Sequence, residues 1–179
     1  MSIPDYQSLM LPVLAASSKG EVRIGDVVEK LADEFKLTPE DRSELLPSGR
    51  QTVFSNRVHW AKTYLVKARL IEITRRGYFR ITDRGQDVLK SNPVRIDNSF
   101  LTQFAEFREF KDRSVEQSER ENRTALPVLA EQTQTPDEVM RAAHSQIETT
   151  LAQDLLDRIL KAPPEFFERL IVTLLLSMG

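Results

Sequence analysis

One segment of the chain, residues 52–68, combines side chains that could contact DNA with side chains that could fill a protein core. At 100° per residue of an α-helix, Phe54, Val58 and Leu65 fall on one face. The opposite face gathers hydrogen-bonding and cationic side chains, and no acidic residue occurs between positions 51 and 70. Amides and hydroxyls can read base edges in a major groove, and cations can pair with the flanking phosphates. This pattern therefore predicts a recognition helix.

A second basic group follows this helix at a turn. Arg75 and Arg76 precede Gly77 at the tip of a hairpin, which is indicated by alternating residues over 70–74 and 78–81. A guanidinium at a protruding tip suits phosphate contact or entry into a narrow minor groove. Charged turns and polar helix faces also occur on proteins that bind no DNA, but no acid lies within residues 75–80, which favours DNA contact. The complete predicted DNA-contacting set is Arg50, Gln51, Thr52, Ser55, Asn56, His59, Lys62, Thr63, Lys67, Arg75, Arg76, Tyr78 and Arg80.

Helices and a hairpin must position these groups. Amphipathic spacing predicts an N-terminal helix that Pro12 kinks or splits, and Thr38 and Thr82 stand where helix N-caps are expected. In the hairpin, we expect Ile71 and Ile73 on the buried face of the first strand. The predicted helices cover residues 6–16, 24–35, 39–46, 52–68 and 83–90. Residues 1–93 are thus predicted to form a winged helix-turn-helix domain within a mainly α protein.

The rest of the chain is predicted to be a helical extension. Residues 94–135 form a connector, in which phenylalanines at 100, 104, 107 and 110 indicate a short docking helix and residues 116–133 a polar linker. Residues 136–179 form two helices, which begin after a capping pattern at Thr135 and are separated by a break at 162–164. Because the last helix is almost wholly apolar, we expect it to pack on the preceding helix, in an oligomer or against a further domain.

Charge separates one stretch of the chain from the rest. Residues 48–90 carry 10 basic and 3 acidic residues, a formal charge of +7, whereas the whole chain of 179 residues has a net charge of −2. A local excess of this size is typical of proteins that bind polyanions, although a solvated basic face would look the same.

The composition excludes several kinds of site. Cysteine is absent, which excludes disulfides, thiol catalysis and zinc fingers, and His59 and His144 are too few for a dedicated transition-metal site. The sequence shows neither a secretory signal nor a membrane-spanning stretch, so we expect a cytoplasmic protein. Asp97, Glu109 and Lys111 match the spacing of a metal-dependent nuclease motif, whose residues stand on strands. The phenylalanines around Glu109 recur at helical intervals, which argues against that motif.

Several short motifs resemble the N-terminal winged-helix domain of Mrr-type restriction endonucleases, which are modification-dependent, type IV enzymes. These motifs are LPSGRQ at residues 46–51, NRVHWA at 56–61, KARL at 67–70, RG at 76–77 and ITDRG at 81–85. The run PEFFERL at 164–170, together with SMG at 177–179, is similar to the first helix of the nuclease domain of that family.

The resemblance implies the DNA-binding region of an enzyme that cleaves modified foreign DNA with Mg²⁺. The strand-borne Asp and Glu/Gln-x-Lys motif of the family has no counterpart in this sequence. We therefore expect residues 136–179 to be the start of a truncated nuclease domain, and the chain alone to be inactive and to hold no metal or cofactor. Mg²⁺ is expected only for the missing nuclease domain. Glu168 is the only position that could match the helix glutamate seen near the metal in related nuclease folds.

The expected partners are double-stranded DNA, with methylated DNA implied by the resemblance, and a second copy of the chain bound through the C-terminal helices. Two alternatives remain open. A winged-helix transcriptional regulator that dimerises through its C-terminal helices would prefer a palindromic site and ignore base methylation. A protein-interaction module with a winged helix would bind no DNA.

Overall fold

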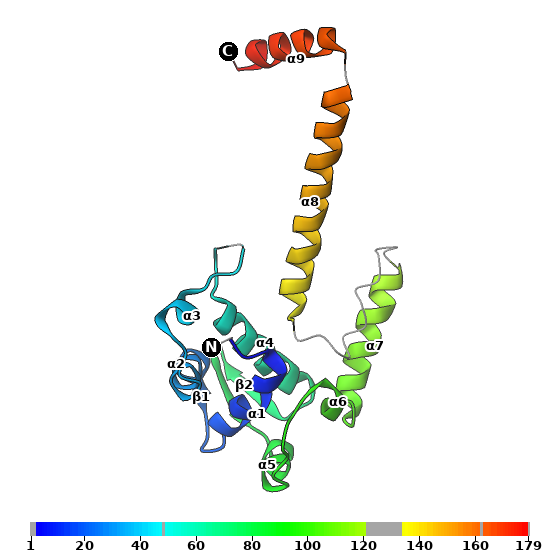
Figure 1. Ribbon diagram of the computed structural model, residues 1–179. Helices are drawn as coiled ribbons and strands as arrows, with labels where there is room; N and C mark the ends of the chain where they lie inside the picture. Colours follow the sequence, from blue (N-terminus) through cyan, green and yellow to red (C-terminus); the bar gives the residue numbers. More distant parts are fainter. Residues whose placement is uncertain (1–2, 48, 121–133, 162, 179) are drawn as a thin grey trace. The chain divides into compact units, whose positions relative to one another are not determined.

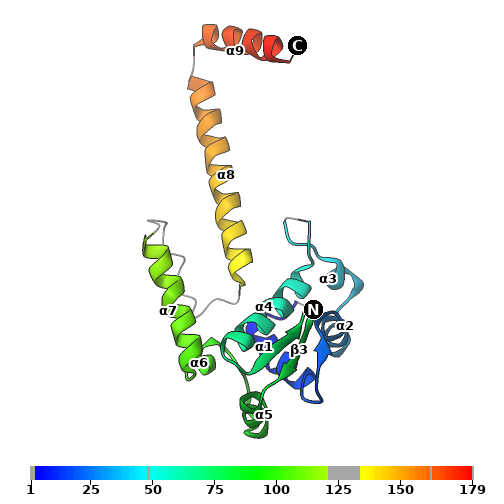
Figure 2. The ribbon, with the colours of Figure 1, turned by 180° about the vertical axis from the view of Figure 1, so that it is seen from behind.

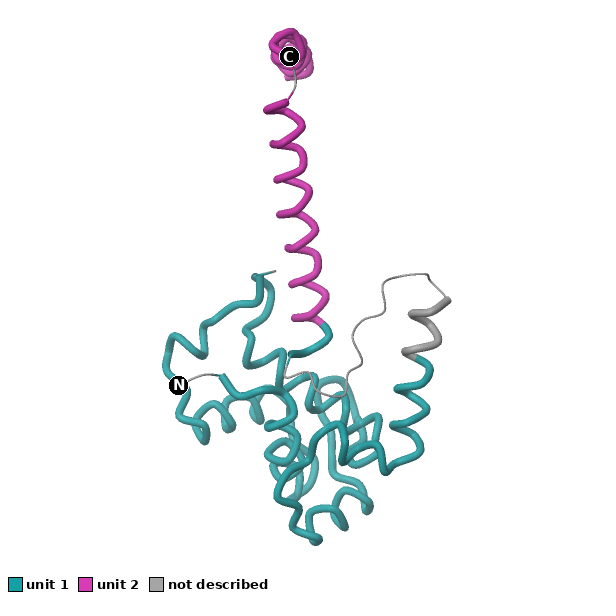
Figure 3. The backbone as a smooth tube through the Cα atoms, turned by 45° about the vertical axis from the view of Figure 1, so that its right-hand side comes forward, with its two compact units in different colours: residues 1–136 teal, residues 137–179 magenta. Residues whose placement is uncertain are grey.

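The computed structural model describes residues 3–47, 49–120, 134–161 and 163–178. The chain divides into two compact units, residues 1–136 and 137–179 (Figure 3). Helices and strands of the first unit are shown in Figure 1. They are α1 (Tyr6–Ala16), β1 (Val22–Arg23), α2 (Ile24–Glu34), α3 (Pro39–Ser43), α4 (Val53–Lys67), β2 (Ile71–Arg75), β3 (Tyr78–Ile81), α5 (Asp83–Lys90), α6 (Asn98–Leu101) and α7 (Ala105–Arg120). The order confirms a mainly α fold with a winged helix.

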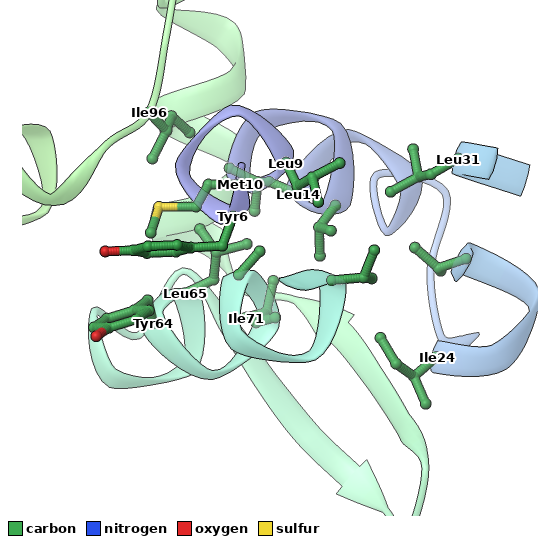
Figure 4. Close-up of a cluster of buried hydrophobic side chains, with 14 of the residues drawn as sticks. Tyr6, Leu9, Met10, Leu14, Ile24, Leu31, Tyr64, Leu65, Ile71 and Ile96 are labelled. Atoms are coloured by element: carbon green, nitrogen blue, oxygen red, sulfur yellow. The ribbon is translucent and has the colours of Figure 1, made fainter. Parts of the chain in front are cut away.

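The first unit has its core between α1 and α4. Tyr6, Leu9 and Leu14 of α1 are buried against Tyr64 and Leu65 of α4 (Figure 4). The rings of Tyr6 and Tyr64 stack with their centroids 5.3 Å apart. Full burial of each such side chain contributes about 1.5–3 kcal/mol, so this contact fixes the position of α4.

α1 is a single helix, and the expectation that Pro12 splits it is wrong. The Asp5 carboxylate caps its first turn by accepting hydrogen bonds from the amides of Gln7 and Ser8. Residues on both sides of the proline, Met10 and Val13 among them, are fully buried. Their packing stabilises the helix despite the amide hydrogen bond that proline cannot make.

The hairpin of β2 and β3, which we call the wing, belongs to a sheet of three strands. The strand order is β1-β3-β2 and all pairs are antiparallel, with Val22 opposite Phe79. The hairpin that contains β3 can be followed in Figure 2. β1 was not predicted, because two residues are too short to show alternation. Ile71 is buried, but Ile73 is 57% exposed, which corrects its predicted burial. β2 is an edge strand, so the Ile73 side chain has a neighbouring strand on one side only.

Helix ends largely follow the predicted signals. The Thr38 hydroxyl and the Asp41 carboxylate form a reciprocal capping box at the start of α3, and the Thr82 hydroxyl caps α5. α3 ends at Ser43, three residues before the predicted end. Leu45 instead forms an isolated bridge to Thr52, which leads the chain into α4.

The connector packs on α4 through α7, and Asn98 of α6 donates a hydrogen bond of 2.7 Å to the hydroxyl of Tyr6 on α1. The Phe107 ring lies 5.7 Å and the Phe110 ring 6.3 Å from the Tyr64 ring, centroid to centroid. The predicted docking helix is therefore confirmed, although it forms as two helices. The predicted linker is wrong for residues 116–120, which are part of α7, and its remainder, residues 121–133, lies outside the described residues.

The second unit contains most of α8 (Pro136–Lys161) and α9 (Pro164–Ser177), as the sequence predicts. Neither helix has a buried side chain among its described residues. Apolar side chains such as Leu155 and Ile171 are at least half exposed. Packing of α9 on the preceding helix therefore does not cover its apolar residues. In the part of the chain that the structure describes, no helix has the length and apolar character needed to cross a membrane.

Candidate nucleic-acid interface

The polar face of α4 lies outside the core. The Thr52 hydroxyl begins the helix by accepting a hydrogen bond of 3.3 Å from the Ser55 amide. On the core side, Phe54 and Val58 are buried. On the other side, four of the predicted side chains are half-buried and so keep part of their surface in solvent. These are Ser55, His59, Lys62 and Thr63.

A groove of about 650 Å³ lies between α2, the first turns of α4 and the tip of the wing. Four residues of the predicted set line it: Thr52, Ser55, His59 and Arg76. Arg23 and Arg42 also line it, whereas Glu29 is the one carboxylate among the lining residues. Its apolar lining comes from Ile24, Val28, Ala32 and Phe54. The groove therefore combines an apolar lining with arginine side chains, of which Arg42 also pairs with Asp33 at 2.7 Å and Arg23 with Asp26 at 3.9 Å.

His59 and Lys62 stand in an electropositive part of this surface. Burial lowers the pKa of His59, and the nearby charge of Lys62 lowers it further. Burial also lowers the pKa of Lys62. A close carboxylate would have the opposite effect on both groups. A bound anion would therefore stabilise the charged forms of both side chains.

In the wing, Arg75 has two partners. Its guanidinium donates a hydrogen bond of 3.0 Å to Glu21 and lies over the Tyr78 ring, 3.8 Å from the centroid. The Glu21 carboxylate also accepts a bond of 2.6 Å from the Thr74 hydroxyl, and this bond together with the Arg75 charge lowers the pKa of Glu21. Arg75 remains exposed, but it is held by a carboxylate that the sequence pattern does not place beside it.

Arg80 is paired as well, since its guanidinium donates to Glu72 on the neighbouring strand. Both side chains of this pair are about half exposed. Surface ion pairs of this kind are worth roughly 0–1 kcal/mol, so a phosphate can compete for the arginine. Arg76 is exposed at the turn, where Gly77 adopts the expected positive φ of 81°.

Asn56 is the predicted residue that the structure places elsewhere. Its side chain is 3% exposed and lies on the inner side of the helix, which corrects its predicted position on the polar face. Its Nδ2 donates to Gln51 Oε1 at 3.3 Å, and its Oδ1 accepts a hydrogen bond of 3.0 Å from the hydroxyl of Thr135. Asn56 therefore supports the first turn of α4 from within.

The remaining predicted residues lie at the edges of this surface. Arg50 is exposed before α4. The Thr63 hydroxyl donates to the carbonyl of His59 at 2.9 Å. Lys67 is exposed at the end of α4, with its Nζ 4.9 Å from the centre of the Phe110 ring. The structure thus brings Thr52, Ser55, His59 and Arg76 into one groove and leaves Lys67 at the opposite end of the helix.

Two arginines of the basic stretch have structural roles. Arg57 donates hydrogen bonds of 2.8 and 3.3 Å to the carbonyls of Ile3 and Pro4. Arg84 donates to both carboxylate oxygens of Glu106, at 2.9 and 3.2 Å, and so joins α5 to α7. These hydrogen bonds hold the pKa of Glu106 down to about 2. The charge of residues 48–90 is thus only partly available to a ligand.

Comparison with known proteins identifies the domain that carries this surface. The family model described as the Mrr N-terminal domain matches residues 6–91. Residues 6–91 form an Mrr N-terminal domain. The match includes α1 to α5, the wing and every lining residue of the groove.

The whole chain is also similar to a curated protein that carries this family name. It is 26% identical over 188 aligned positions to the type IV methyl-directed restriction enzyme EcoKMrr of Escherichia coli (strain K12). The alignment covers 100% of this chain and 60% of the E. coli enzyme. The chain therefore spans about three fifths of the length of that relative. No solved structure matches the chain significantly.

Beyond the Mrr N-terminal domain, the nuclease-like spacing does not form a metal site. The Asp97 carboxylate caps α6 by accepting from the Phe100 amide, and Glu109 and Lys111 lie on a helix rather than a strand. Glu168 is an exposed residue of α9. Within the described ranges, no three His, Cys, Asp or Glu side chains are grouped so that they could hold a metal ion. We therefore derive no catalytic step through Mg²⁺ from these residues.

Sequence reasoning missed four residues of the Mrr N-terminal domain that shape its surface. Arg23 and Arg42 come from the acidic first quarter of the chain and reach the groove only through the fold. Glu21 reaches Arg75 because β1 pairs with β3. The pairing of Glu72 with Arg80 could have been predicted from the sequence, because a hairpin that turns at residues 76–77 brings position 72 opposite Arg80.

Proposed function

We propose that the Mrr N-terminal domain of this chain binds double-stranded DNA with the polar face of α4 and the wing. The carrying observation is the groove between α2, α4 and the wing, which is lined by three arginines, His59 and the carboxylate of Glu29. Two of these arginines have further partners, since Arg42 pairs with Asp33 at 2.7 Å and Arg23 with Asp26 at 3.9 Å. Both carboxylates are exposed, so a phosphate can compete for the arginines. In this proposal α4 enters the major groove with Ser55, His59 and Lys62, and the wing contacts the backbone through Arg75, Arg76 and Arg80. Asn56 is left out, because it is buried.

The electrostatics of α4 support this function. Burial lowers the pKa of both His59 and Lys62, and the charge of Lys62 lowers that of His59 further. A nearby DNA phosphate would favour the charged form of both side chains. In the wing, the carboxylates of Glu21 and Glu72 hold two arginines that remain exposed. DNA phosphates could replace the two carboxylates as partners of these arginines, because the existing ion pairs are weak.

We further propose that the domain belongs to an enzyme that restricts modified foreign DNA in the cytoplasm. The similarity to a methyl-directed restriction enzyme over the whole chain supports this proposal. Residues 136–179 would then be the start of the nuclease domain, and Mg²⁺ would act in the part of that domain that carries the catalytic motif. Affinities for methylated and unmethylated duplexes of the same sequence would test whether the chain prefers modified DNA. Equal affinity would favour a transcriptional regulator over a restriction enzyme.

The decisive test of DNA binding is a triple variant of exposed or half-exposed cations, Lys62→Ala, Arg75→Ala and Arg76→Ala. Fluorescence anisotropy with a labelled duplex should show roughly tenfold or greater loss of affinity. The slope of log affinity against log salt concentration should become shallower by about 1 for each phosphate contact that is lost. Both effects follow because fewer counterions are released when fewer cations reach the DNA backbone.

A matched control removes the same charge elsewhere. Lys30, Lys90 and Arg108 are exposed, and none of them lines the groove. Changing all three to Ala should leave the affinity within about twofold at moderate salt, because distant surface charges are screened. If the site variant binds as tightly as wild type, or if the control weakens binding equally, α4 and the wing are not the interface.

A second copy of the chain is our proposed partner for α8 and α9. Leu155, Leu160 and Leu175 are among many apolar side chains in these helices that are half exposed or more. Such exposed apolar residues mark interaction surfaces. Sedimentation of the purified chain should show a dimer or larger oligomer. Leu155→Asp with Leu160→Asp should give monomers that still bind DNA.

A further inference from the structure

A directional chain of hydrogen bonds runs through the first turn of α4. The hydroxyl of Thr135 donates to Asn56 Oδ1 at 3.0 Å. Asn56 Nδ2 donates to Gln51 Oε1 at 3.3 Å, and Gln51 Nε2 donates to Ser55 Oγ at 3.3 Å. The chain therefore begins at a residue that directly precedes α8 and ends at a residue that lines the groove.

The direction of this chain follows from the chemistry of its members. An amide side chain has one donor end and one acceptor end. Because Asn56 presents its oxygen to Thr135, its nitrogen must face Gln51, and Gln51 must then turn its own nitrogen toward Ser55. Asn56 and Thr135 are 3% and 0% exposed, so water does not compete at the start of the chain.

The last member becomes a hydrogen-bond donor toward the groove. Ser55 Oγ accepts from Gln51, which leaves its own hydrogen available, and no acceptor for that hydrogen occurs within the described part of the chain. The side chains of Arg23, Arg42 and Arg76 line the same groove and can only donate. Arg42 lies 3.9 Å from the carboxylate of Glu29 and pairs with Asp33 at 2.7 Å.

We propose that this groove binds one backbone phosphate of DNA, and that Thr135 is a positioning residue for it because its hydroxyl orients Asn56, Gln51 and Ser55. The inference rests on the proposed DNA-binding function and assigns a ligand to one part of that interface. A phosphate accepts hydrogen bonds and carries negative charge, so it matches a serine donor beside arginines. Loss of the Thr135 hydroxyl removes the hydrogen bond to Asn56 Oδ1. Reversal of the two amides would then turn the Ser55 hydrogen toward Gln51 instead of the groove.

Phosphate ethylation interference tests this proposal at single positions of a bound duplex. With the wild-type chain, ethylation of the phosphate in the groove should weaken binding. Ser55→Ala and Thr135→Val should each lower DNA affinity roughly 3- to 10-fold, as expected for one lost hydrogen bond. Both should reduce interference at that phosphate and leave it unchanged at the phosphates that Arg75 and Arg80 contact. The double variant should lose no more affinity than either single variant, because both remove one contact.

Controls separate positioning from a general structural effect. Thr135→Ser keeps a hydroxyl donor and should restore the wild-type pattern. Thr102→Val removes a hydroxyl that donates to the Ser99 carbonyl outside the groove, and it should change nothing. The positioning role is overturned, while DNA binding stands, if Thr135→Val weakens interference equally at every phosphate. The same conclusion follows if the affinity losses of Thr135→Val and Ser55→Ala add up in the double variant. If wild type binds no duplex, the proposed function itself fails.

Discussion

The carboxylate of Glu21 accepts a hydrogen bond of 3.0 Å from the guanidinium of Arg75, which ties the residue before β1 to the tip of the wing. The same carboxylate accepts from Thr74, and the Arg75 guanidinium stacks on Tyr78. Arg75, which we propose as a phosphate contact, is thus already paired with a carboxylate of the same chain. Glu21 and a DNA phosphate would compete for its guanidinium.

Removal of that competitor should strengthen DNA binding. Glu21→Gln keeps an oxygen that can accept from Thr74 but loses the negative charge that attracts Arg75. We expect affinity for duplex DNA to rise about twofold to fivefold at low salt. The gain is limited because the ion pair between Glu21 and Arg75 in the DNA-free protein contributes no more than about 1 kcal/mol. Anisotropy titrations would measure the change, with exposed Glu40→Gln as the charge-matched control. Weaker binding by Glu21→Gln would show that the carboxylate helps to orient Arg75.

His59 should make DNA affinity depend on pH. Its pKa in the free protein lies below the usual 6.5, chiefly because the side chain is half-buried and also because Lys62 is near. A phosphate would favour the protonated ring, so binding should take up a proton and tighten as the pH falls from 8 to about 5.5. His59→Gln should flatten this dependence at constant ionic strength. His144→Gln, on α8, should keep it, and a wild-type profile that is flat would exclude His59 from the interface.

The pair of Arg84 and Glu106 should make stability depend on acid pH. The carboxyl pKa falls from its ordinary value of 4.5 to about 2 in the folded protein, chiefly through the hydrogen bonds from Arg84. A depressed carboxyl pKa stabilises the folded state above pH 4.5, and this contribution disappears as the pH falls toward 2.

Urea unfolding of Glu106→Gln across this pH range measures the effect. Wild type should be more stable than the variant at pH 6, and the two free energies of unfolding should converge near pH 2. Glu109→Gln, which alters an exposed pair with Arg113, should follow the wild-type curve closely. A constant difference between wild type and Glu106→Gln at all pH values would contradict the assignment.

Gly85 should not tolerate a side chain. A Cβ atom at this position would lie 2.1 Å from the carbonyl oxygen of Leu70 and 2.8 Å from a side-chain carbon of Ile81. Gly85→Ala should therefore lower the free energy of unfolding by roughly 1–3 kcal/mol or more, since overpacking forces the backbone to move. In Gly25→Ala the new atom would meet only Arg23 Nε at 3.9 Å, so this variant should be neutral or up to about 1 kcal/mol more stable. Chemical denaturation of both variants would check the contrast.

Local interactions explain why much of the fold could be predicted from the sequence. The Thr38 and Thr82 caps act within three residues, and the apolar spacing of residues 54–65 defines the buried face of α4 by helical geometry alone. The winged-helix order and the family resemblance depend on such local patterns. The structure brings His59 and Arg76, both from the predicted set, into one groove.

The tertiary structure decided which of the polar groups remain available to a ligand. Asn56 follows the helical pattern of an exposed residue, yet it is buried because Thr135, 79 positions along the chain, packs against it. Arg75 is part of an acid-free run, yet a strand that is only two residues long brings Glu21 to it. Charge neutralisation and burial depend on distance in space, whereas periodicity reports only the neighbours on the same element. For that reason the sequence predicted which region carries the candidate interface, and the fold determined which of its side chains are exposed, paired or buried.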